Sequence, residues 1–399
     1  MHQHRHLFER ICALENLIAA AKAALRGKRM RLPGAAFFAD FEKEVFALHD
    51  ELWVGTYRHG GYTYFTIHEP KERLVAAAPF RDRVVHHAIV RIIEPIFERR
   101  FIEDTFACRR GKGSHAAMRR AAEFARRWPC ALKCDVRKYF PSIDHQVLMR
   151  LLQRVIADPR LMALIGALLG THADGQRQQW TPGGDLFDVQ VFNRGLPIGN
   201  LTSQFFANVY LNPLDHFVKH ELRVKGYVRY MDDFLLFGND RTALRRQGRE
   251  VRDKLAELRL EIHPDKYRLT PTAAGVDFAG YVVRADGRIR VRSSSVRRFD
   301  RRYKRMLWNL RRHRTKAARI TQSVRAWVAH ASHAQSNGLR RSVLYGRRKT
   351  GDRAKGTDSY RGLRGGNWNN NSNNLASSNR NNDNPTNENN NIGFRVASS

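Results

Sequence analysis

Cysteine is scarce in this chain of 399 residues, and its placement excludes several classes of site. There are four cysteines, with no Cys-x-x-Cys pair and no spacing typical of a zinc site: Cys12, Cys108, Cys130 and Cys134. A disulfide scaffold and a zinc finger are therefore not expected. Such sparse cysteine usage fits a reducing compartment, so we expect the protein to be cytoplasmic.

Long apolar runs are missing as well. No stretch approaches the ~18 residues of a membrane-spanning helix, and the N-terminus lacks the apolar segment of a signal peptide, so no membrane contact is expected. A P-loop is also absent, because the segment Gly111-Lys112-Gly113 does not have the Gly-x-x-x-x-Gly-Lys-Ser/Thr spacing.

Acidic residues are few compared with basic ones. The chain has 38 Asp plus Glu against 71 Lys plus Arg, which gives a formal net charge of +33. A charge of this size predicts a polyanionic partner, nucleic acid above all. The basic residues are spread along most of the chain, which favours a long groove over one small patch.

Hydrophobic periodicity predicts an intermixed set of helices and strands. Helical patterns cover residues 7–25, 37–53, 79–97, 145–169, 201–222, 241–258 and 296–310. Strand patterns pair residues 62–67 with 73–78 and 276–283 with 288–291, whereas 171–185 form a polar, Gly-rich connection. Because there is no regular βαβ rhythm, the predicted fold class is α+β.

The most informative stretch is Tyr230-Met231-Asp232-Asp233, which lies between two short apolar runs. This pattern predicts a β-hairpin with two adjacent carboxylates at its tip. The alternative is that both aspartates are solvated turn residues, since Asp is favoured in turns.

A third carboxylate, Asp135, follows the predicted strand at residues 131–134. Three carboxylates about 5 Å apart would repel by roughly 3 kcal/mol per pair at an effective dielectric near 20. Metal binding or proton uptake relieves that repulsion. Hard divalent cations prefer such oxygens, so the cluster predicts a two-metal phosphoryl-transfer site.

Five blocks, in order along the chain, resemble the motifs of a reverse transcriptase. They are residues 73–75 with 79–87, 106–113, 133–145, 196–204 and 230–233. Residues 276–283 also resemble its primer-gripping hairpin, and the arginine-rich helix after Val296 resembles its thumb. An ordered set of motifs is far more specific than one tetrapeptide.

The resemblance implies a right-hand polymerase architecture with fingers, a palm built on an antiparallel sheet, and a helical thumb. The implied divisions are an N-terminal helical extension (1–54), fingers (55–130), palm (131–290, with a fingers insertion near 145–195), thumb (291–350) and a low-complexity tail (351–399).

The same resemblance implies the catalytic residues. Asp135, Asp232 and Asp233, with the backbone of Val136, would bind two Mg²⁺ ions, which Mn²⁺ can replace. Lys266 lies where polymerases carry a lysine that can protonate pyrophosphate; Arg268 or solvent is the alternative.

Further residues are implied for the incoming dNTP. Arg73 and Arg81 would contact the triphosphate, which suits the bidentate geometry of arginine, with an ordinary surface charge as the alternative. Phe140 corresponds to the steric gate that favours deoxynucleotides, with core packing as the alternative. The set is completed by Ile198, Gly199, Ser203 and Gln204.

Two departures indicate a type of reverse transcriptase. Ile198-Gly199 stands where many members carry Gln-Gly, and Ser203-Gln204 stands where others often have Ser-Pro. Both departures match the enzymes of diversity-generating retroelements, which misincorporate opposite template adenines. A neutral apolar exchange is the alternative for Ile198.

The C-terminal tail is rich in asparagine, which fills fourteen of the thirty-three positions 367–399. Composition alone predicts disorder. Residues 364–396 also resemble the C-terminal end of a lectin-like, formylglycine-generating-enzyme-type fold, a typical target of these retroelements. Because asparagine codons begin with two adenines, we hypothesise that the reading frame continues into a template repeat; an unrelated Asn-rich linker is the alternative.

The implied partners are an RNA template, a DNA primer, dNTPs and a small basic accessory protein. The nearest alternative is a group II intron or retron reverse transcriptase. A non-catalytic nucleic-acid-binding protein and a ligand-binding lectin-like protein are the alternatives from other classes.

Overall fold

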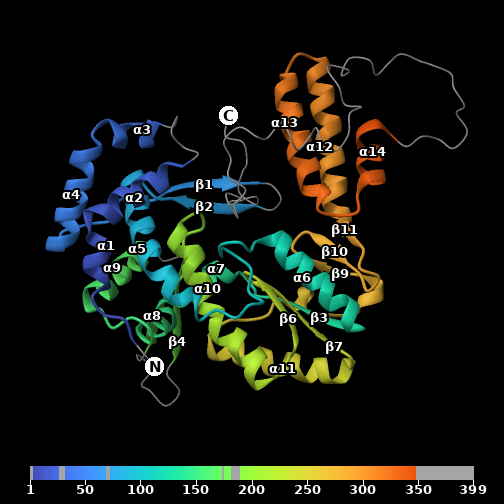
Figure 1. Cartoon of the computed structure of the whole chain (residues 1–399), viewed down its shortest axis with the longest axis horizontal. Helices are drawn as coiled ribbons and strands as arrows, with labels where there is room; N and C mark the ends of the chain where they lie inside the picture. Colours follow the sequence, from blue (N-terminus) through green and yellow to red (C-terminus); the bar gives the residue numbers. More distant parts are fainter. Residues whose placement is uncertain (1–2, 27–31, 69–71, 173–174, 181–188, 347–399) are drawn as a thin grey trace, which may run out of the picture.

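The computed structural model describes residues 3–26, 32–68, 72–172, 175–180 and 189–346 (Figure 1). The tail at residues 351–399, for which disorder was predicted, lies outside these ranges. Helices and antiparallel sheets intermix along the chain, which confirms the α+β class. None of the described helices combines the length and apolarity needed to cross a membrane.

A four-stranded antiparallel sheet lies at the centre, in the order β6-β7-β3-β8. The strands are β6 (Gly226–Tyr230), β7 (Asp233–Gly238), β3 (Cys130–Asp135) and β8 (Arg268–Pro271). The predicted hairpin and the predicted strand before Asp135 are therefore confirmed, and they are direct neighbours.

Each face of this sheet borders a different hydrophobic core, because successive side chains on a strand point to opposite faces. Leu132 and Leu236 belong to one core, which also includes residues of α5 (Phe80–Glu98), α10 (Leu201–His216) and α11 (Arg241–Glu257). Ala131, Leu235 and Phe237 belong to the other core, together with residues of α6 (Ser114–Arg127).

The second core continues into a small sheet and a helical column that projects from it (Figure 1). The sheet contains β9 (Val276–Phe278), β10 (Tyr281–Val283) and β11 (Ile289–Val291); the column contains α12 (Ser293–Arg311), α13 (Ala317–Ser332) and α14 (Asn337–Tyr345). The strand predicted for 276–283 is broken, because Ala279 and Gly280 both have positive φ (48° and 90°) and turn the chain. Phe299 and Trp327 join α12 to α13, with stacked rings 4.3 Å apart.

Three of the predicted helical stretches are each divided into two shorter helices, so the single helix predicted for residues 7–25 was wrong. These pairs are α1 (Leu7–Cys12) with α2 (Leu14–Leu25), α3 (Leu32–Ala39) with α4 (Phe41–Val54), and α8 (His145–Gln153) with α9 (Pro159–Gly170). Ala13 is extended (ψ 133°) and separates the first pair, so that α1 and α2 both reach α5. Asp158 separates α8 from α9 by capping the Leu161 N–H at 3.1 Å.

Several shorter elements complete the described fold. β1 (Thr63–Ile67) pairs with β2 (Arg73–Ala77), as predicted. The connection predicted for 171–185 instead includes β4 (Gly175–Trp180), which pairs with β5 (Val189–Arg194). The helix predicted to end at residue 222 ends at His216 and continues as a π-helical turn, Phe217–Glu221. A short helix, α7 (Tyr139–Ser142), follows β3.

Candidate active site

The structure brings Asp135, Asp232 and Asp233 together at one end of the central sheet. Asp135 is the direct antiparallel partner of Asp233, and such pairs have Cα atoms about 5 Å apart. Asp232 occupies the two-residue turn between β6 and β7, after Met231, whose φ of 58° suits the turns that join antiparallel strands. The Val136 N–H donates to the Asp232 carbonyl at 3.1 Å, which fixes the turn against the end of β3.

The electrostatics of this cluster disfavour negative charge. Burial raises the pKa of Asp232 to about 6, and the nearby charge of Asp135 adds to the increase. Burial also raises the pKa of Asp233 to about 7, against the opposing effect of the Lys133 ammonium. Carboxyl groups in such an environment are stabilised by a proton or by a cation.

Two lysines supply positive charge to the cluster. The Lys266 Nζ donates to Asp135 Oδ1 at 2.5 Å, so the structure places this predicted residue at the site. The Lys133 Nζ donates to Asp233 Oδ2 at 3.1 Å and to the Asp277 carbonyl at 2.7 Å. Lys133 was missed from the sequence, although it stands two residues before Asp135 and therefore on the same face of β3.

The acids can be tested for their fit to a divalent cation. Across the described ranges, no three His, Cys, Asp or Glu side chains are arranged so that they could hold a metal ion. Ammonium groups occupy one oxygen of Asp135 and one of Asp233. The other oxygen of Asp233, Oδ1, is buried and has no hydrogen-bond partner. This donor set suits a hard cation, provided that the ammonium groups give way to it.

A buried ion pair supports the hairpin from behind. Arg229 is fully buried on β6 and donates to both carboxylate oxygens of Asp215, at 2.7 and 2.5 Å. Its third contact is the Met231 carbonyl in the turn, at 3.0 Å. The hydroxyls of Tyr227 and Thr105 also donate to Asp215, at 2.7 and 3.0 Å. This network was missed from the sequence; the signal for it is an arginine inside an otherwise apolar strand, which needs a buried partner.

The turn that contains Ile198 and Gly199 is bonded to β2. The Ala76 N–H donates to the Ile198 carbonyl at 2.9 Å, and the Asn200 Nδ2 donates to the Ala76 carbonyl at 3.1 Å. Gly199 has a φ of 116°, and a Cβ there would lie only 2.9 Å from Val75 Cγ1. Glycine is therefore required for the close approach of this turn to β2.

The two arginines that were predicted to bind the triphosphate are placed differently. Arg73 lies on β2, and its charge lowers the pKa of Asp232 against the larger effect of burial, so it acts on the aspartate cluster. Arg81 is not brought to that cluster. Its guanidinium pairs with Glu51 at 2.6 Å and with Glu44 at 3.8 Å, because α4 presents both acids to the start of α5.

The other predicted nucleotide-binding residues are Phe140, Ser203 and Gln204. Phe140 is half-buried against the first core, and its carbonyl accepts a hydrogen bond from the Leu196 N–H at 3.0 Å. Ser203 is buried in α10. The Gln204 Oε1 accepts a hydrogen bond from Cys108 Sγ at 3.3 Å, which links α10 to the predicted block at residues 106–113.

Comparison with known proteins decides the family. Residues 67–283, more than half of the chain, match the family described as reverse transcriptase (RNA-dependent DNA polymerase). This chain belongs to the reverse transcriptase family. The reverse transcriptase is therefore an RNA-directed DNA polymerase with a polymerase fold, and its class works on an RNA template with divalent metal ions. Residues 320–399 separately match a sulfatase-modifying factor enzyme 1-like domain.

Individual relatives cover the reverse transcriptase to different extents. Protein YkfC of Escherichia coli is 26% identical over 69% of this chain and 82% of its own length. The group II intron-encoded protein LtrA of Lactococcus lactis is 29% identical over 37% of this chain, but only 23% of its own length is covered. A solved structure of telomerase from Candida albicans with a telomeric RNA fragment has a TM-score of 0.42 at 13% identity, over 68% of this chain and 53% of that one.

Proposed function

We propose that the reverse transcriptase adds deoxynucleotides to a DNA primer at Asp135, Asp232 and Asp233. One observation carries this proposal: two separate segments bring Asp135 and the Asp232–Asp233 hairpin to the same end of one sheet. Asp135 is 8% exposed, and the two hairpin acids are half-buried, so the cluster is shielded yet reachable.

The proposed cation ligands are Asp135, Asp232, Asp233 and the backbone of Val136, with two Mg²⁺ ions that Mn²⁺ can replace. When bound, such ions lower the pKa of the primer 3′-hydroxyl and neutralise the charge of the triphosphate. The Arg229–Asp215 pair then serves to hold the hairpin turn in place, since Arg229 donates directly to the Met231 carbonyl.

The proposed dNTP contacts come from the surrounding elements. Arg73 would bind the triphosphate; Arg81 would have to leave Glu51 before it could join. Lys266, already at Asp135, can hold the proton that the leaving pyrophosphate takes. Phe140 would crowd a ribose 2′-hydroxyl. The turn at Ile198–Gly199 would contact the incoming nucleotide, with Ser203 and Gln204 in α10 behind this turn.

We further propose that the enzyme is of the diversity-generating retroelement type and makes adenine-mutagenic cDNA from a template-repeat RNA. The Ile198-Gly199 and Ser203-Gln204 departures support this, as does the second family match over residues 320–399. A small basic accessory protein would belong to such a system, with the N-terminal helices or the column α12–α14 as its docking sites.

A group II intron-type enzyme is the second candidate, and the similarity to LtrA and to a nuclear intron maturase of Arabidopsis thaliana favours it. Sequencing of cDNA made in vitro separates the two. Errors concentrated opposite template adenines support the retroelement type; errors spread evenly over the four template bases support the intron type.

The catalytic assignment is tested by primer extension on an RNA template with Mg²⁺. Asp232→Ala should abolish extension while the affinity for the primer–template is retained, because the carboxylate is assigned to chemistry. Asp253→Ala is the matched control, since Asp253 is an exposed aspartate on the outer side of α11. Full activity of Asp232→Ala, or loss of binding together with activity, would refute the assignment.

A further inference from the structure

One flank of α11 carries an arginine stripe that the active site does not use. Five exposed arginines follow this helix: Arg241, Arg245, Arg246, Arg249 and Arg252. We name Arg245, Arg249 and Arg252 the α11 stripe. They are spaced i, i+4 and i+7, so they share one face and span about 10 Å of helix.

The stripe converges on Tyr267, which immediately precedes β8. The Arg252 guanidinium lies over the Tyr267 ring, 5.1 Å from its centre. All three stripe arginines act to lower the pKa of this phenol, against the larger effect of its burial, which places their charges around the same group.

The three arginines of the α11 stripe form no ion pair with the described carboxylates of this helix. Among the residues that the structure describes, the carboxylates on α11 pair with Arg246 (Glu250, 3.8 Å) and with Lys254 (Glu257, 2.7 Å), and none pairs with the stripe. Asp253 is the remaining acid of the helix. Three guanidinium groups on one helix that form no ion pair with a described carboxylate are suited to a regular polyanion.

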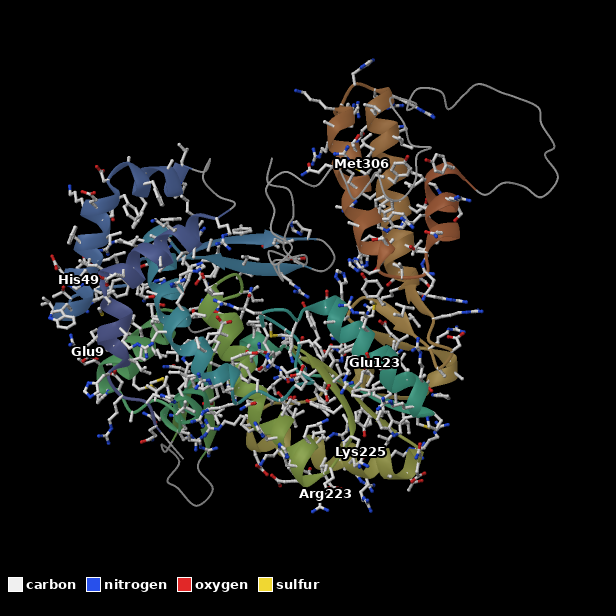
Figure 2. The ribbon with its side chains drawn as sticks, viewed as in Figure 1. Glu9, His49, Glu123, Arg223, Lys225 and Met306 are labelled. Atoms are coloured by element: carbon white, nitrogen blue, oxygen red, sulfur yellow. The ribbon has the colours of Figure 1, made fainter. Side chains whose placement is uncertain are left out.

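The helix α11 lies on the other face of the sheet from the proposed catalytic aspartates. A Cβ on Gly248 would lie 2.6 Å from Leu132 Cδ2, so Leu132 points at α11, and Asp135 on the same strand, three residues on, points to the opposite face. In Figure 1, α11 forms the lower edge of the molecule, while β1–β2 and the column α12–α14 lie above the sheet. Figure 2 shows Arg223 and Lys225 at the same lower edge, far from Met306 on α12.

We propose that the α11 stripe binds the phosphate backbone of the RNA template outside the segment held at the aspartates. This inference rests on the proposed placing of the primer–template at Asp135 and the hairpin. The duplex is proposed for the face of the sheet opposite to α11, so the stripe is assigned to a separate stretch of the same RNA. Phosphate contacts carry no sequence information, so the contribution is to affinity and to the path of the RNA.

The test compares two probes: a primer–template of about 10 base pairs, and the same duplex with a single-stranded RNA extension of roughly 30 nucleotides. The extension should tighten binding to the unaltered enzyme about tenfold or more. Arg245→Glu/Arg249→Glu/Arg252→Glu should lose that gain, and its salt slope on the extended probe should fall by about 2, at ~0.7 per phosphate contact. The rate at which the enzyme elongates the primer of the short primer–template should be unchanged in this variant. A failure of the stripe proposal can therefore be told apart from a failure of the catalytic assignment.

Two matched variants make the outcome decisive. Arg245→Lys/Arg249→Lys/Arg252→Lys keeps the charge and should keep most of the gain. Arg5→Glu/Arg150→Glu/Arg154→Glu makes the same charge change at exposed arginines on and near α1 and α8, and should also keep it. The proposal is overturned if the extension gives no gain, if the stripe variant retains it, or if the matched variant loses as much.

Discussion

At the scale of single residues, the Asp232–Asp233 hairpin depends on a buried charge, that of the Arg229 guanidinium. Arg229 is fully buried and satisfies both oxygens of Asp215 as well as the Met231 carbonyl. Removing one member of such a pair leaves the other charge without compensation, whereas removing both costs much less. The pair therefore couples the stability of the central sheet to the geometry of the turn.

Arg229→Met should lower the free energy of unfolding by about 3–5 kcal/mol, because Asp215 is left buried and charged. The double variant Arg229→Met/Asp215→Asn should recover part of that loss, since no charge remains buried and the amide oxygen can still accept a hydrogen bond from Tyr227 or from Thr105. Denaturant unfolding of the four members of this cycle measures the coupling. Additive losses would show that the two residues do not act as a pair.

At the scale of elements, the turn at residues 196–200 and strand β2 form one unit through Ala76, and Gly199 makes their contact close. Gly199→Ala should cost roughly 1–3 kcal/mol of stability, because the residue has a positive φ and its Cβ would meet Val75. We also expect a higher KM for dNTP, since the turn would shift from β2.

Two comparisons define the result for Gly199→Ala. Gly170→Ala, at the end of α9, has no neighbour within 4 Å and no positive φ, so it should leave both quantities unchanged. Val75→Ala in the Gly199→Ala background should relieve the clash but not the backbone strain. An unchanged KM in Gly199→Ala would separate this turn from nucleotide binding.

The junction between α6 and α13 is the second element-scale contact. His115 on α6 stacks on His333 with ring centres 3.4 Å apart, beside His330 and Tyr281. Burial lowers the pKa of His115 to about 4, and the charges of His333, His330 and Arg119 act in the same direction. Burial likewise lowers the pKa of His330.

Acid should loosen this junction. Because the folded-state pKa of His115 is below its unfolded value near 6.5, the unfolded chain binds more protons between pH 6.5 and 4. Neutral His115 therefore contributes fully to the free energy of unfolding above pH 6.5. That free energy should fall by about 2 kcal/mol between pH 7 and pH 5. His115→Gln should flatten the pH dependence of unfolding by that amount, whereas His6→Gln, at an exposed residue, should not. Parallel pH curves for His115→Gln and the unaltered protein would contradict this.

The sequence predicted most elements but not their breaks. Periodicity identified α5, α11, the hairpin and β1–β2, because each has a strong apolar pattern over its full length. It did not reveal the division at Ala13, because that division depends on packing against α5. The division at Asp158 had a local signal that periodicity does not use: Asp158 caps the Leu161 N–H, and Pro159 is the first residue of α9. The three aspartates could be predicted as a cluster; Lys133, Arg229 and the pairing of Arg81 with Glu51 could not, because side-chain pairing depends on the assembled fold.

At the scale of the whole molecule, the net charge of +33 dominates how the enzyme meets nucleic acid. If binding neutralises about 6–10 phosphates, the affinity for a primer–template should fall by roughly 10³–10⁵ between 50 and 200 mM salt. Two unrelated template sequences should give the same slope, because phosphate contacts do not depend on bases. Titrations at several salt concentrations check this. A shallow slope would mean that few of these charges face the nucleic acid.

Strand β7 has a consequence for which changes in chain length the enzyme can tolerate. Phe234 and Leu236 lie in one core, Leu235 and Phe237 lie in the other, and Asp233 begins the strand. Inserting or deleting a single residue here would exchange the side chains of the two cores and move Asp233 away from Asp135 in one step. Natural variation in this family should therefore add residues in the connection between β7 and α11, and keep constant both the two-residue turn before Asp233 and the spacing from Asp233 to Phe237.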